Sequence, residues 1–155
     1  MLIMDIVSEL VNGLFDKDDK TAYKCLKELE LKSEKDNSVY PHLDTFAEMI
    51  DNPNSYIRTR GLRLISTNAK WDADNKIDEV IDKYLKHIKD DKSITARQCI
   101  KALPNIAKFK PDLIGCICTA LNKANPEMYA SSMVELVYVD VKTALEQIRE
   151  LEDTQ

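Results

Sequence analysis

The feature that most constrains this chain is a stripe of apolar residues that recurs about every 35 residues. Members of each stripe lie three or four positions apart, which places them on one face of an α-helix. Val7, Leu43, Ile81 and Ile114 are equivalent members, so successive copies lie 36, 38 and 33 residues apart. A period in this range indicates stacked supersecondary units that bury their apolar faces against one another. The stripes are Ile3, Val7, Leu10 and Leu14; Val39, Leu43, Phe46 and Ile50; Ile77, Ile81, Tyr84 and Ile88; and Ile114, Ile117 and Leu121.

A second helix in each copy aligns at the same offsets. One of its columns is always small, which predicts close approach of the facing helix and explains a glycine that costs about 1 kcal/mol in helix propensity. Turn formers and capping residues lie between the two helices of each copy, which therefore form a hairpin. The aligned sets are Ala22, Cys25, Leu26 and Leu29; Arg58, Gly61, Leu62 and Ile65; Ala96, Cys99, Ile100 and Leu103; and Tyr129, Ser132, Met133 and Leu136.

The segment from Ile57 to Ile65 resembles the second-helix signature of the HEAT repeat family, with Arg58, Gly61 and Leu62 at its basic, small and aliphatic positions. The resemblance covers about residues 2–138. It implies an all-α fold, a right-handed α-α superhelix (solenoid) of about four HEAT-like helical hairpins. We expect one domain over residues 1–155, with repeats at about 2–33, 37–72, 74–110 and 111–138.

A C-terminal capping helix is expected over about residues 140–152, because Asp140 can cap it and its apolar residues form one stripe. Terminal repeats need a polar outer face, which accounts for the acidic end of the chain. The stripe is Val141, Ala144, Leu145, Ile148 and Leu151.

Several classes of protein are not expected. The N-terminus lacks the basic segment of a signal peptide, and no apolar run approaches the ~18 residues of a membrane span, so we expect a cytoplasmic protein without a membrane partner. The four cysteines are interpreted as reduced and structural. Cys116 and Cys118 lie two apart on a helix and point to different faces, so no metal or other cofactor is expected.

Six basic residues are the candidate partner-binding site. Five of them occupy the side of the second helices opposite the buried columns, and Arg97 lies on the flank of the same surface. In HEAT-like solenoids these helices line the concave face. The resemblance therefore implies a basic ridge there, although the chain carries a net charge of −5. The alternative is an ordinary solvated helix face, since Lys and Arg are good helix formers. The residues are Lys24, Lys27, Arg60, Arg63, Arg97 and Lys101.

The functional hypothesis is a non-catalytic scaffold or adaptor that binds a protein or acidic peptide on this ridge. The alternative is binding of nucleic acid through its phosphates, distantly like the HEAT-like alkylpurine DNA glycosylases. An enzyme is not expected, because no catalytic motif is present and no Asp lies in the basic region. His42 and His87 share no repeat column and are interpreted as residues at the edge of the core. The sequence leaves the oligomeric state open.

Overall fold

The computed structural model describes residues 5–154 and is all-α, with no strand in that range. The chain divides into two compact units, one ending at Lys76 and the other beginning at Ile77. Each unit contains two of the four predicted hairpins, and each is described by itself below.

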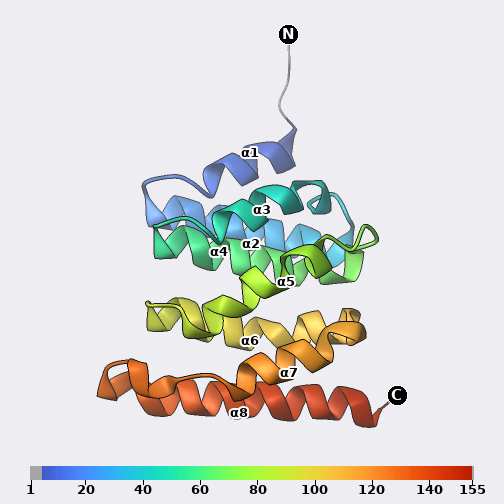
Figure 1. Cartoon of the computed structure of the whole chain (residues 1–155). Helices are drawn as coiled ribbons and strands as arrows, with labels where there is room; N and C mark the ends of the chain where they lie inside the picture. The colour runs from blue at the N-terminus through green and yellow to red at the C-terminus, as the bar shows by residue number, and fades with distance from the viewer. Residues whose placement is uncertain (1–4, 155) are drawn as a thin grey trace. The chain divides into compact units, whose positions relative to one another are not determined.

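The N-terminal unit contains the helices α1 (Ile6–Gly13), α2 (Asp19–Lys35), α3 (Leu43–Met49) and α4 (Ser55–Thr67). The 3₁₀ turn η1 (Tyr40–His42) precedes α3, and the turn η2 (Ala69–Trp71) follows α4. Helix α1 packs on α2 and α3 packs on α4, while α2 and α4 lie side by side (Figure 1). The side chains of Asp18 and Asn54 accept hydrogen bonds from the first turns of α2 and α4, so both helices begin at predicted turn residues.

The core of this unit follows the predicted stripes. Val39, Leu43, Phe46 and Ile50 are fully buried, as are Ala22, Leu29, Leu62 and Ile65. Val7 and Leu10 are half-buried, and Ile3 lies outside the described residues.

The small column lies at close helix contacts. A Cβ placed on Gly61 would lie 2.8 Å from the backbone oxygen of Phe46 on α3, so only glycine fits there. In the first hairpin, a Cβ placed on Gly13 of α1 would overlap the Sγ of Cys25 on α2.

The C-terminal unit contains α5 (Lys76–Leu85), α6 (Ser93–Phe109), α7 (Ile114–Asn122) and α8 (Ser131–Asp153). The 3₁₀ turn η3 (Lys86–Lys89) extends α5. The turns η4 (Pro111–Leu113) and η5 (Pro126–Met128) precede α7 and α8, respectively. Helices α6 and α8 run side by side, and α7 lies across them (Figure 1). In the third hairpin, the Cys99 thiol on α6 donates to the backbone oxygen of Tyr84 on α5 at 3.6 Å, again at the small column.

The separate capping helix predicted from residue 140 is wrong. Residues 131–153 form one continuous helix, because this segment contains neither glycine nor proline to interrupt it. Asp140 lies in mid-helix, is buried, and caps nothing. The apolar stripe itself is present, with Ala144 and Ile148 buried on α8.

The register predicted for the second helix of the fourth hairpin is also wrong. Ser132 is exposed and Leu136 retains 41% of its exposed surface, whereas Val137 is 1% exposed. The turn η5, which begins at Pro126, occupies part of the segment before α8. The helix therefore begins later than the repeat offset implies, and a different face of it is buried.

Candidate functional site

The six predicted basic residues fall into two groups. Lys24 and Lys27 on α2 and Lys101 on α6 are exposed, as expected for partner-binding residues. The Lys27 ammonium, which is half exposed, lies 3.6 Å from the largely covered Glu30 carboxylate. The three arginines lie differently.

The prediction that Arg60 is exposed is wrong, because its side chain keeps only 8% of its exposed surface. Its Nη1 donates to the backbone oxygen of Leu14 at 2.9 Å, just after α1, and its Nη2 lies 3.3 Å from the Asp19 carboxylate. The guanidinium thus satisfies a carbonyl that α1 leaves without an intrahelical donor. Arg60 joins the first hairpin to the second and cannot meet a partner.

Arg63 is only partly accessible and is already paired. Its Nε and Nη2 donate to the two carboxylate oxygens of Glu30 on α2, at 3.1 and 2.8 Å. A two-bond arginine–carboxylate pair of this kind neutralises the charge and fixes the geometry of both side chains. Because Glu30 also contacts Lys27, the basic surface predicted for this unit is reduced to Lys24 and a partly screened Lys27.

Arg97 forms the corresponding pair in the C-terminal unit. Its Nε donates to Asp140 Oδ2 at 2.5 Å and its Nη2 lies 3.4 Å from Oδ1. The Arg97 side chain is 24% exposed and that of Asp140 8%. The hydrogen bonds that Arg97 donates to Asp140 raise the pKa of Arg97, so this guanidinium is held charged against α8. Its role is to join α6 to α8.

Lys101 lies beside this pair and lines two adjoining hollows between α6 and α8, with volumes of about 510 and 270 Å³. We call them together the α6–α8 groove. Lys101 and Gln147 line both hollows. The further lining residues are Pro104, Asn105, Lys108, Glu150, Leu151 and Thr154 in the larger hollow, and Asp140, Thr143 and Ala144 in the smaller.

The groove combines exposed ammonium groups with side-chain amides. Lys101 and Lys108 lie two helical turns apart on α6, and both are exposed. The Lys108 ammonium lies 5.3 Å from the centre of the Phe109 ring. Asn105 and Gln147 each carry an amide that offers both a donor and an acceptor. These are groups that bind carboxylates and peptide backbone; sequence reasoning found Lys101 but missed Lys108, Asn105 and Gln147, which the groove reveals.

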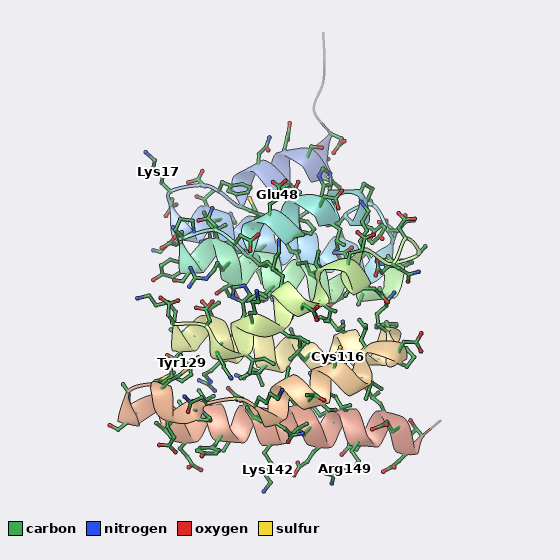
Figure 2. The ribbon with its side chains drawn as sticks, in the orientation of Figure 1. Lys17, Glu48, Cys116, Tyr129, Lys142 and Arg149 are labelled. Carbon is green, nitrogen blue, oxygen red and sulfur yellow. The ribbon has the colours of Figure 1, made fainter. Side chains whose placement is uncertain are left out.

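His87, Asp90 and Tyr129 of this unit have structural partners. His87 Nδ1 lies 2.7 Å from Asp90 Oδ2, and Asp90 Oδ1 accepts from the backbone N–H of Lys92. The Tyr129 hydroxyl donates to the backbone oxygen of Asp90 at 2.6 Å, which ties η5 to the segment before α6 (Figure 2). Over residues 5–154, no three His, Cys, Asp or Glu side chains are grouped so that they could hold a metal ion.

In the same part of the chain, no helix combines the length and the apolar character needed to cross a membrane. Comparison with models of known families, with curated proteins and with solved structures finds no match for this chain. The resemblance to HEAT repeats therefore stays a prediction that rests on the residues of the repeat.

Proposed function

We propose that this chain is a non-catalytic adaptor that holds an extended acidic segment of a partner protein in the α6–α8 groove. The observation that carries the proposal is the exposed pair Lys101 and Lys108, set along a groove that also presents the amide of Gln147. Of the six predicted binding residues, Lys101 lines this groove, whereas Lys24 and Lys27 are exposed on α2 and line neither of its hollows.

The spacing of the two lysines suits an extended chain. Residues seven apart on a helix lie about 10.5 Å apart along its axis. In a polyproline II helix, residues three apart share one face and lie about 9.3 Å apart. Two acidic side chains at i and i+3 can therefore reach Lys101 and Lys108, while the amide of Gln147 binds a backbone group between them.

The fold proposed for the whole chain is the right-handed superhelix of about four HEAT-like hairpins. Its support is the small column, which lies at a close contact between helices in three hairpins, at Cys25, Gly61 and Cys99. A cytoplasmic location belongs to the same proposal, because the four cysteines are all free thiols.

The test measures fluorescence anisotropy of a labelled peptide with a repeating Glu-Pro-Pro sequence, which places a carboxylate at every third residue. Peptides with lysine in place of glutamate, and with the same composition but clustered glutamates, serve as ligand controls. We expect the spaced acidic peptide to bind most tightly and its affinity to fall as salt rises, because the contacts are exposed ion pairs.

Matched variants locate the site. Lys101→Glu/Lys108→Glu should abolish binding, whereas Lys142→Glu/Arg149→Glu, which changes the net charge equally, should not. Both control residues are exposed on α8 and project away from α6 (Figure 2). Equal losses in the two double variants would show that only net charge matters and would contradict the proposal.

Binding of nucleic acid through the same ridge is less well supported than the sequence suggests, because Arg60 is buried and Arg63 and Arg97 are paired with carboxylates. Phosphate-backbone binding draws on many exposed cations at once. Oligonucleotide binding that Lys101→Glu/Lys108→Glu abolishes, with no binding of the acidic peptide, would replace the adaptor proposal with this alternative.

A further inference from the structure

A second cavity lies on the other helices of the C-terminal unit, outside the α6–α8 groove. It has a volume of about 550 Å³ and is lined by residues of α5, η3 and α7. Its apolar residues include Leu85, Ile88 and Ala120, and Ile88 is only 2% exposed, so the floor is recessed. Cavities of 300–1,000 Å³ with apolar walls and a few polar groups are typical of small-molecule sites.

Three lysines surround this floor. Lys86 and Lys89 belong to η3 and Lys123 follows α7, and all three are exposed. Within residues 5–154, none of the three takes part in an ion pair with an acidic side chain. One carboxylate, that of Asp82, also lines the cavity, so the site carries an excess of positive charge. Like charges gathered at one opening repel one another, and a bound anion relieves that repulsion.

We propose that this cavity binds a free single-chain anionic amphiphile, an alkyl carboxylate, with its chain on the floor of Leu85, Ile88 and Ala120 and its head group among the three lysines. The apolar residues account for the alkyl chain and the lysines for the charge. The recessed floor favours a single chain over a bilayer, because a flat lipid surface would meet the exposed lysines without reaching Ile88.

The proposal predicts two differences in affinity between ligands. Each methylene buried on the floor should tighten binding by up to about fourfold, so affinity should rise from octanoate to decanoate to dodecanoate. The neutral alcohol of equal length should bind more weakly, because it cannot pair with the lysines. Isothermal titration calorimetry below the critical micelle concentration measures both.

Variants assign the head group. Lys86→Gln/Lys123→Gln should weaken decanoate binding at least tenfold and leave decanol binding unchanged. The control Lys142→Gln/Arg149→Gln removes equal charge from α8 and should bind decanoate like the wild type. No decanoate binding by the wild type, or decanol binding as tight as decanoate, would overturn the proposal.

Cys116, labelled in Figure 2, provides a readout at the cavity itself. It lines the cavity from α7, whereas Cys118, two residues further on, does not. Burial raises the pKa of both thiols, so both alkylate slowly and can be compared on one peptide. With decanoate at ten times its Kd, iodoacetamide labelling of Cys116 should slow about tenfold and that of Cys118 should not change. Equal slowing of both thiols would place decanoate elsewhere and overturn the proposal.

An experiment with lipid vesicles distinguishes binding of a free amphiphile from binding of a membrane surface. Vesicles of phosphatidylcholine with phosphatidylserine should not sediment with the protein. Sedimentation that the Lys86→Gln/Lys123→Gln variant abolishes would show that the lysines meet a lipid surface, which also overturns the proposal.

Discussion

Gly61 lies where α4 passes closest to α3, and Gly61→Ala tests whether the small column is a requirement of packing. A Cβ at this position would lie 2.8 Å from the Cβ of Met49 and 2.8 Å from the backbone oxygen of Phe46. Carbon atoms in contact lie at about 3.5 Å or more, so the new methyl group is about 0.7 Å too close. A change of rotamer cannot relieve this overlap, because both neighbouring atoms are fixed to the backbone of α3.

The expected cost follows from two opposing effects. Inserting a methyl group into a packed core costs about 1–3 kcal/mol. Replacing glycine by alanine in a helix contributes about 0.5–1 kcal/mol in the favourable direction. Because the Cβ would overlap two atoms at 2.8 Å, the packing cost lies in the upper part of its range, about 2–3 kcal/mol, so Gly61→Ala should lower the free energy of unfolding by about 1–2.5 kcal/mol.

Gly115 provides the matched control for the same substitution. It lies in α7, and a Cβ there would meet nothing within 4 Å. Gly115→Ala should therefore raise the free energy of unfolding by up to about 1 kcal/mol.

Urea unfolding followed by circular dichroism measures both changes as shifts of the midpoint at constant slope. The reasoning fails if Gly61→Ala is neutral or stabilising, or if the two variants shift the midpoint in the same direction.

Three further predictions concern polar groups. Arg60→Met should destabilise the fold by about 1–3 kcal/mol in urea unfolding, because Arg60 is buried and its loss leaves the backbone oxygen of Leu14 without that donor; Lys24→Met, at an exposed position, should be near neutral. Arg97→Met should destabilise by a similar amount, and the double change Arg97→Met/Asp140→Leu should recover most of the loss, since it leaves no buried carboxylate unpaired; a double variant no better than the single one would contradict this. Burial raises the pKa of Tyr129 to about 12, whereas the pKa of an unfolded tyrosine is about 10. The neutral hydroxyl therefore contributes its full stability below about pH 10, and this contribution is lost as the pH rises from about 10 toward 12. Between about pH 8.5 and pH 11, the free energy of unfolding should fall more for the wild type than for Tyr129→Phe.

The part of the fold that the sequence predicts best is the middle of the chain. The stripes from Val39 to Ile50 and from Ile77 to Ile88 are buried as predicted, because their helical spacing directly reports which face lies inside. The fourth hairpin was predicted poorly, because its register was extrapolated from the other three. The turn η5 at Pro126 shifts the start of α8, and a shift of a few residues turns a different helix face inward.

The candidate site was predicted only in part, for a different physical reason. Helical periodicity predicts the direction in which Arg63 and Arg97 leave their helices, but it does not show what those long side chains reach. Their partners are 33 and 43 residues away, on neighbouring hairpins. Lys101 has no such partner among the ion pairs of residues 5–154, and it lies exposed as predicted.

Arginine and lysine differ in chemistry, and this difference affects how the proposed sites bind a ligand. Three arginines join neighbouring hairpins through carboxylates, at Asp19, Glu30 and Asp140, where a planar guanidinium can make two fixed hydrogen bonds. The basic residues of the proposed ligand sites are all lysines: Lys101 and Lys108 in the groove, and the three lysines around the second cavity. An ammonium on a flexible chain acts as a mobile point charge, so it selects a ligand by charge and spacing rather than by a fixed hydrogen-bond geometry. Both proposed sites should therefore accept a carboxylate in several orientations and lose affinity steeply with salt, while their specificity comes from the apolar and amide groups between the lysines.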